Sequence, residues 1–302
     1  IPIGISRQSC DAWMEPELFN MDQQAGAPPD AFAVKGQNWG FPTYNWNRMA
    51  EDGYQWWRRR FEQMHAYFDA FRIDHILGFF RIWSIPEEAV EGILGSFDPA
   101  IPVHVNEFAQ RGIPFDYDRY TRPYITDAVL HKIFGSQAAL VKEYFLVPAG
   151  ESEPSVSSSN QSGRYELKPG FSTQRKIEEW FAAQGHPAKE DWFSGRGAEE
   201  NEALKTGLFD LVSNVLLLEA KESSGDRFHF RISMEDTTSF QALEEHTRGQ
   251  LKDLYIDYFY RRQDDFWREE GMRKLPALKR ATHMLVCGED LGMVPACVPD
   301  VM

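Results

Sequence analysis

Two carboxyl-bearing residues stand directly after apolar runs that are typical of short buried strands. Asp74 follows residues 71–73, and Glu289 follows residues 284–288. The carboxyl ends of parallel strands meet on one face of an α/β barrel, which is where the active sites of such barrels lie. Two carboxyls about 5 Å apart on that face can cleave a glycosidic bond with retention, one as nucleophile and the other as general acid and base.

The neighbours of these carboxyls bear on their ionisation. Because alternate residues of a strand point to the same side, the guanidinium of Arg72 is predicted to hold Asp74 ionised; a purely structural ion pair is the alternative. Burial is predicted to raise the pKa of Glu289 toward neutrality, as a general acid requires; the alternative is an acidic cap of the next helix. His75 either joins this site or has the structural role that is usual for a lone histidine.

The stretch from 36 to 46 is rich in glycine, proline and asparagine and holds four aromatic residues, Trp39, Phe41, Tyr44 and Trp46. Aromatic side chains in such loops often form binding surfaces, and their flat faces match the apolar faces of pyranose rings. Gln37 adds a hydrogen-bonding group for sugar hydroxyls. The alternative is a loop whose rings pack on one another.

Composition narrows the choice of ligand. The chain has 302 residues and a net charge of −14, which disfavours binding to phosphate backbones and to anionic lipid surfaces. The sequence lacks an apolar run long enough to span a membrane, and it lacks the motifs of metal, phosphate-loop, dinucleotide and serine-hydrolase sites. We therefore expect a neutral ligand, no cofactor, no nucleic acid and no membrane partner.

The cysteine count and the two ends of the chain each lead to a prediction. The odd count of cysteines, Cys10, Cys287 and Cys297, favours free thiols and a reducing compartment, so a cytoplasmic location is expected. Residues 1–5 are predicted to be a strand already under way, and residues 298–302 complete no element. We expect a fragment of a longer polypeptide, with its oligomeric state open.

The expected fold class is α/β. Apolar residues from 54 to 71 recur at helical spacing and lead into the strand at 71–74, and residues 274–282 lead into the strand at 284–288. The two carboxyls are much further apart than the roughly 30 residues of one βαβ unit. A mainly helical insertion is therefore predicted at 101–280, with helices at 208–220 and 251–262, a strand at 227–234 and a flexible loop at 150–163. Segments 1–100 and 281–302 would carry the nucleophile strand and the acid/base strand.

Several short strings, taken in order, resemble the 4-α-glucanotransferases of glycoside hydrolase family 77, which include the amylomaltases and disproportionating enzymes. These strings are SCDAW at 9–13, PPDAF at 28–32, GQNWG at 36–40, EDGYQWW at 51–57, FRIDH at 71–75 and GEDLG at 288–292. The interval 101–280 further resembles the long form of the family known from plants and bacteria, through residues 115–119, 136–137, 234–240 and 260–263.

The resemblance implies part of a (β/α)8 barrel with a large insertion. It implies Asp74 as nucleophile, Glu289 as general acid/base, maltose, maltooligosaccharides or soluble glucan as substrates, and no cofactor. The residues implied in substrate binding are Arg72, His75, Gln37, Trp39, Asp30 and Phe32. The family uses a third acid that would lie beyond Met302, so the fragment alone is predicted to be inactive.

Two other functions remain open from the sequence. One is a retaining α-glucan hydrolase of the α-amylase group, which uses water as the acceptor and so raises the count of reducing ends from maltotriose. The other is a non-catalytic glucan-binding segment, for which replacement of Asp74 would leave turnover in the parent protein intact.

Overall fold

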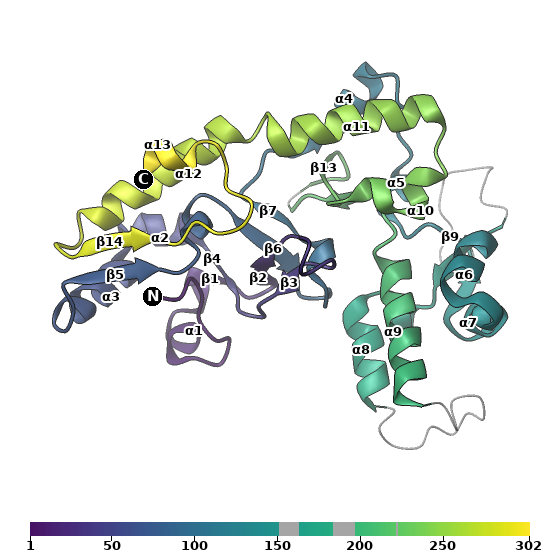
Figure 1. Cartoon of the computed structure of the whole chain (residues 1–302), viewed down its shortest axis with the longest axis horizontal. Helices are drawn as coiled ribbons and strands as arrows, with labels where there is room; N and C mark the ends of the chain where they lie inside the picture. The colour runs from purple at the N-terminus through teal and green to yellow at the C-terminus, as the bar shows by residue number, and fades with distance from the viewer. Residues whose placement is uncertain (151–162, 184–196, 222) are drawn as a thin grey trace. The chain divides into compact units, whose positions relative to one another are not determined.

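The computed structural model describes residues 1–150, 163–183, 197–221 and 223–302. Most of the loop predicted at 150–163 lies outside these residues. The chain divides into two compact units. Unit 1 comprises residues 1–87, 95–103 and 253–302, and unit 2 comprises residues 88–94 and 104–252 (Figure 1).

Unit 1 contains one pair of parallel strands, β5 (Ala70–Ile73) and β14 (Leu285–Gly288), which lie side by side in Figure 1. Both strands were predicted from their apolar runs. On the other edge of β5, the amino group of Ile1 donates to the Arg72 carbonyl at 2.6 Å, and the Asp74 amide donates to the Ile1 carbonyl at 2.9 Å. The first residues thus run alongside β5 in the same direction, although they form no assigned strand.

The other strands of unit 1 are antiparallel. A sheet of order β3-β2-β6-β7 contains β2 (Gln23–Ala27), β3 (Gln37–Asn38), β6 (Ile82–Pro86) and β7 (Ser96–Asp98). A smaller pair joins β1 (Phe19–Asn20) to β4 (Thr43–Tyr44). These sheets were not predicted, because most of the strands are too short for an alternating pattern to be recognised.

The helices of unit 1 cover an aromatic core. They are α1 (Cys10–Met14), α2 (Trp46–Glu51), α3 (Gln55–His65), α12 (Asp264–Lys279) and α13 (Val298–Val301), with short 3-10 turns η1 (Pro16–Leu18) and η2 (Ile76–Phe79). On α3, Trp57 and Phe61 are almost fully buried. The predicted helix extends too far, since α3 ends at His65 and Phe68 is 55% exposed.

Helix α12 belongs to unit 1, whereas the predicted insertion at 101–280 contains all of it. The buried Lys274 explains the difference, because its Nζ donates to the carbonyl of Phe79 at 2.9 Å and pairs with Glu270 at 2.9 Å. A buried ammonium needs such partners. These contacts tie α12 to the segment that follows β5.

Unit 2 is mainly helical. Its helices are α4 (Val105–Gln110), α5 (Tyr117–Thr121), α6 (Asp127–Phe134), α7 (Ala138–Phe145), α8 (Gln174–Ala183), α9 (Ala198–Val212) and α10 (Thr238–Gln241). Strands β10 (Leu146–Pro148), β11 (Arg164–Leu167) and β9 (Ile125–Thr126) form one antiparallel sheet, and β12 (Leu217–Glu219) pairs with β13 (Arg227–Phe230). Strand β8 (Val103–His104) and helix α11 (Glu245–Tyr260) span the boundaries between the units in the sequence.

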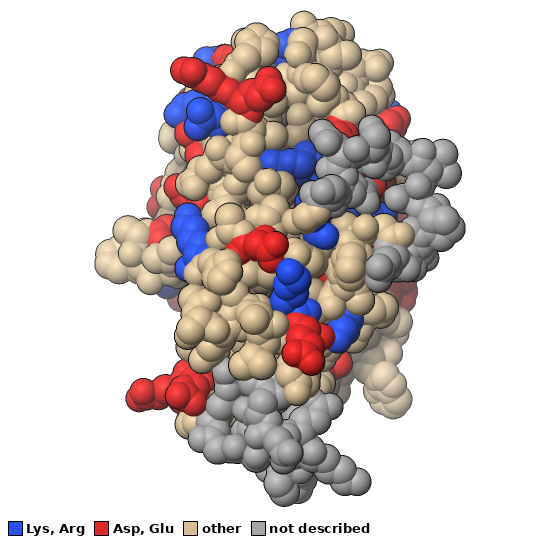
Figure 2. Space-filling view, turned by 90° about the vertical axis from the view of Figure 1, so that its right-hand side faces the viewer, with Lys and Arg blue, Asp and Glu red and all other residues tan. Residues whose placement is uncertain are grey.

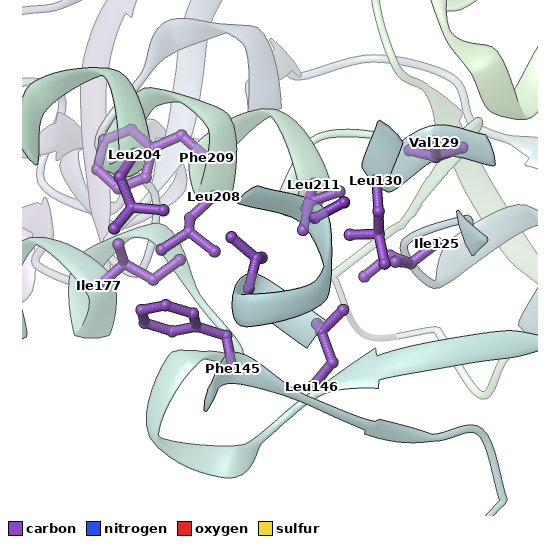
Figure 3. Close-up of a cluster of buried hydrophobic side chains, with 12 residues drawn as sticks. Ile125, Val129, Leu130, Phe145, Leu146, Ile177, Leu204, Leu208, Phe209 and Leu211 are labelled. Atoms are coloured by element: carbon purple, nitrogen blue, oxygen red, sulfur yellow. The ribbon is translucent and has the colours of Figure 1, made fainter. Parts of the chain in front are cut away.

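Buried side chains of α6, α7, α8 and α9 form the core shown in Figure 3. Leu204, Leu208 and Leu211 recur along one face of α9 at helical spacing and are buried there. The helix predicted at 208–220 is wrong in its bounds, because α9 ends at Val212 and 217–219 form β12. The Ser213 hydroxyl donates to the Phe209 carbonyl at 3.0 Å, a local bond that competes with continuation of the helix.

Figure 2 shows Lys and Arg side chains interspersed with Asp and Glu side chains on the face that it presents. No described helix is both long and apolar enough to cross a membrane.

Candidate active site

The parallel ladder brings the two predicted carboxyls together. Residue Gly288 of β14 is paired with Ile73 of β5, so Glu289 and Asp74 follow at the same end of adjacent strands. The Glu289 amide donates to the Ile73 carbonyl at 3.0 Å, and the Ile76 amide donates to the Glu289 carbonyl at 2.9 Å. The side chains of Asp74 and Glu289 are close enough for each to shift the pKa of the other. The two carboxyls are thus within direct reach of each other.

The pKa shifts of this pair are opposite in direction to those predicted. The His75 amide donates to Glu289 Oε2 at 2.9 Å, and this bond, with the Asp74 hydrogen bond and the Arg72 charge, lowers the pKa of Glu289 despite partial burial. Burial, followed by the hydrogen bond and charge of Glu289, raises the pKa of Asp74. The pKa values of the two carboxyls are therefore shifted in opposite directions, Asp74 upward and Glu289 downward.

The charge of Arg72 acts on both carboxyls of the pair. Its Nη2 lies 3.7 Å from Glu289 Oε1, and its effect in lowering the pKa of Asp74 is outweighed by burial and by Glu289. The Arg72 side chain is 66% exposed, so water weakens its influence. The alternation of side chains along β5 predicted the side of the strand on which Arg72 lies. It did not predict that the carboxyl nearest to Arg72 would be that of Glu289.

His75 has a left-handed backbone conformation with φ of 51°. This conformation is uncommon for a non-glycine residue, and the His75 amide donates to Glu289. The imidazole meets the Trp39 ring edge-on, with ring centroids 5.1 Å apart. Burial, followed by the charge of Arg81, lowers the pKa of His75 to about 4, so the ring is neutral at pH 7.

A cavity of about 520 Å³ lies beside the pair. Six of the predicted site residues line it: Asp30, Phe32, Gln37, Trp39, His75 and Glu289. The predicted residues Arg72 and Asp74 are not part of its wall. Sites of this size with aromatic walls and a few polar groups are typical of small-molecule binding.

The segment from Asp30 to Trp39 owes its shape to local hydrogen bonds. Asp30 Oδ1 accepts from the amides of Phe32 and Ala33 at 2.8 and 2.6 Å, so this carboxylate shapes its own turn. Phe32 is 99% exposed. Gln37 Oε1 accepts from the indole Nε1 of Trp39 at 3.1 Å, which fixes the ring against the cavity.

The interpretation of the 36–46 stretch as a binding surface is wrong for Tyr44 and Trp46. Both are buried, with Tyr44 5.5 Å and Trp46 6.3 Å from the Trp57 ring between centroids. The alternative of rings that pack on one another holds for these two. Trp39 alone of the four lines the cavity.

The sequence reasoning missed several wall residues. Arg81, Trp83 and Phe97 line the cavity, together with residues 291–293 after Glu289. Arg81 is only 2% exposed. The rings that Arg81 contacts belong to Phe97 and Trp267, which are distant in the sequence, so the string FFRIW around it held no local signal for this role.

The described residues contain no group of three or more His, Cys, Asp or Glu side chains arranged to hold a metal ion. The site is thus a carboxyl pair next to an aromatic wall, an arrangement found in enzymes that act on glycosidic bonds.

The sequence profile of the 4-alpha-glucanotransferases, glycoside hydrolase family 77, matches residues 1–302, and the chain belongs to this family. It is 42% identical over 302 residues to 4-alpha-glucanotransferase DPE2 of Oryza sativa subsp. japonica, which covers all of this chain and 30% of that protein. It is 43% identical over 83 residues to a 4-alpha-glucanotransferase of Chlamydia pneumoniae, 28% of this chain and 16% of that one. The chain thus spans less than a third of either relative.

Among solved structures, the chain is similar to an amylomaltase from Corynebacterium glutamicum, with a TM-score of 0.30 and 30% identity over 32% of this chain and 13% of that one. It is also similar to an amylomaltase from Streptococcus agalactiae in complex with acarbose, with a TM-score of 0.32 and 20% identity over 85% of this chain and 56% of that one.

Proposed function

We propose that the protein containing this chain is a 4-α-glucanotransferase that moves α-1,4-glucan or glucosyl units from maltose or maltooligosaccharides to another glucan, without a cofactor. The observation that carries this proposal is the neighbouring pair of Asp74 and Glu289 at the same end of adjacent parallel strands, beside a cavity lined by Glu289 and Trp39. Family membership and the names of the relatives support it.

The proposed mechanism is double displacement with retention. Asp74 attacks the anomeric carbon while Glu289 donates a proton to the leaving oxygen, which yields a covalent glycosyl-enzyme and a free sugar. Glu289 then takes the proton from the hydroxyl of an incoming sugar, and the new bond to that oxygen replaces the bond to Asp74.

One proton shared by the two carboxyls suffices for the first step. For attack this proton has to be on Glu289, which leaves Asp74 as the carboxylate nucleophile. The charge interaction between the two carboxyls disfavours ionisation of both at once. Such a pair titrates as a unit rather than as two separate groups.

We further propose that unit 1 contributes three neighbouring strands of a (β/α)8 barrel. In support, Ile1 bonds to one edge of β5 in the pattern of a parallel pair, and β14 pairs parallel with the other edge. Unit 2 would then be an insertion between the nucleophile strand and the acid/base strand. A third acid supplied by another part of the protein would make this chain inactive on its own.

A cytoplasmic location is proposed from the cysteines. Cys10, Cys287 and Cys297 are free thiols, and Cys297 is buried. Free thiols are typical of reducing compartments. Fractionation of the source cells, followed by an assay of each fraction for transfer activity, tests this location.

Incubation of the full-length protein with maltotriose tests the proposed function. A transferase produces longer and shorter oligosaccharides while the total of reducing ends stays constant. A rise in reducing ends would identify a hydrolase instead. Neither change, with a folded protein, would leave a glucan-binding role.

A further inference from the structure

The loop after Glu289 is fastened to unit 1 at three points. At its start, the Glu289 amide donates to the Ile73 carbonyl at 3.0 Å. At the far end, the Cys297 amide donates to Asp264 Oδ1 at 3.1 Å. Between them, Nη2 of Arg81 donates to the carbonyl of Met293. Arg81 therefore holds the middle of the loop whose first residue is the proposed acid/base.

Arg81 is itself fixed by two aromatic rings. Its guanidinium carbon lies 4.0 Å from the centre of the Phe97 ring and 4.8 Å from that of Trp267. Those rings meet edge-to-face with centroids 5.3 Å apart. Cation–ring contacts are strongest where water is excluded, and Arg81 is nearly fully buried. The rings come from β7 and α12, so three segments fix one guanidinium.

A buried guanidinium is normally paired with a carboxylate. Within the described part of the chain Arg81 has no such partner, and its Nε has no hydrogen-bond acceptor. Burial lowers the pKa of Arg81 to about 9, which still leaves it protonated at pH 7. A charge kept in this position without a paired carboxylate costs stability, which points to a role at the cavity rather than in the core.

We propose that Arg81 is a positioning residue for Glu289: by holding the Met293 carbonyl, it keeps the loop and the acid/base carboxyl in place against the bound sugar. This inference rests on the proposed function. Glu289 and Met293 both line the cavity. A displacement of Met293 would therefore move the part of the cavity wall against which the leaving sugar would bind. A misplacement of about 1 Å can cost about 100-fold in rate.

The test uses a substrate that bypasses the acid. When an α-maltosyl fluoride reacts, the C–F bond breaks as the bond to Asp74 forms, and fluoride leaves without needing a proton. Glycosyl transfer from maltotriose does need that proton from Glu289. The ratio of the two rates therefore reports on the acid alone, whereas a general loss of folding lowers both rates equally.

The variants are Arg81→Met, Arg81→Lys and the matched control Arg60→Met, all in the full-length protein. Arg60 also lies over two rings, 4.4 Å from the centre of Trp56 and 5.4 Å from that of Trp57, but it does not line the cavity. We expect Arg81→Met to slow transfer from maltotriose about 100-fold and the initial fluoride burst by less than about fivefold. Arg81→Lys should slow transfer by about tenfold, and Arg60→Met should change neither rate more than about twofold.

Equal losses of both rates in Arg81→Met, or no loss, would overturn the inference. If that variant does not fold, the same ratio measured on Arg81→Lys decides. Amide hydrogen exchange of residues 290–296 gives a readout independent of activity: it should quicken in Arg81→Met and not in Arg60→Met. A wild-type protein that shows neither transfer nor a fluoride burst would refute the proposed function, while the exchange measurement would still test the positioning of the loop.

Discussion

Aromatic residues from one short stretch of the chain lie in two different environments, the core of unit 1 and the wall of the cavity. Tyr44, Trp46 and Trp57 are packed in the core of unit 1, whereas Trp39 faces a cavity and meets His75. The residue types are the same, so type does not decide the role. The difference is that Trp39 is oriented by the polar Gln37 next to the carboxyl site, while the others contact mainly rings. Replacements on the cavity side should change chemistry, and replacements in the core should change stability.

The largest effect is expected at the carboxyl pair. Asp74→Asn in the full-length protein removes the proposed nucleophile but keeps the shape of the side chain, so transfer from maltotriose should fall by about 10⁴-fold or more. The thermal midpoint should hardly change. Asp69→Asn is the matched control, because this exposed residue lies before β5; it should retain activity. Turnover that survives in Asp74→Asn would refute the assignment.

Replacement of an aromatic residue in the core should lower the free energy of unfolding. Trp57 is 0% exposed, and replacing it by alanine leaves a large void, which should lower the free energy of unfolding by about 3–5 kcal/mol. Urea denaturation measures this change. Trp39→Ala should cost less than about 1 kcal/mol in the same experiment, since a cavity-lining ring has fewer packed neighbours. Similar losses in the two variants would erase the contrast between core and cavity.

Two histidines should make the free energy of unfolding depend on pH. Burial is the main cause that lowers the pKa of His75, at the cavity, and of His229, in unit 2, to about 4 each. The unfolded chain, with an ordinary pKa of 6.5, binds these protons first as the pH falls. The free energy of unfolding should therefore decrease between pH 6.5 and pH 4, by roughly 2 kcal/mol for each histidine.

The variant His75→Gln tests how much of this pH dependence comes from His75, at the cavity. Its stability should fall less steeply over that pH range than the wild type, while His65→Gln, at an exposed position, should leave the slope unchanged. A slope that His75→Gln does not alter would show that the imidazole is solvated in the folded protein.

The smallest effect is expected in the choice of acceptor. Trp39→Ala should raise hydrolysis relative to transfer by about 5- to 10-fold, because a lost ring contact of about 1 kcal/mol weakens docking of the sugar that competes with water. Product analysis with maltotriose gives both rates. Trp13→Ala is the control, since this ring is 85% exposed and does not line the cavity. An unchanged ratio in Trp39→Ala would place the acceptor elsewhere.

The sequence predicted the elements that carry the carboxyls because their signals are local. Apolar runs mark β5 and β14, and each carboxyl follows its run directly. The choice between core and cavity for Tyr44 and Trp39 depends on neighbours far away in the chain, which no local pattern contains. Arg81 was missed for the same reason, since Phe97 and Trp267 become its neighbours only on folding.

The lowered pKa of Glu289 could not be predicted from the sequence, for a geometric reason. Its largest cause is one backbone amide, that of His75, which donates to Glu289. The left-handed conformation of His75 has no signature in residue types, because histidine adopts it only occasionally. Burial was expected to dominate at Glu289, but the His75 amide, Asp74 and Arg72 together outweigh it.

The ladder between β5 and β14 sets the spacing of the two carboxyls through the Ile73 carbonyl and the Glu289 amide, not through the residues that connect them. The entropy of closing a loop grows only slowly with its length. Unit 2 can therefore be lengthened, trimmed or exchanged for another domain at little cost to the spacing of the reactive groups. This freedom makes the region a natural place for evolution, or a protein engineer, to graft new properties onto an unchanged reaction centre.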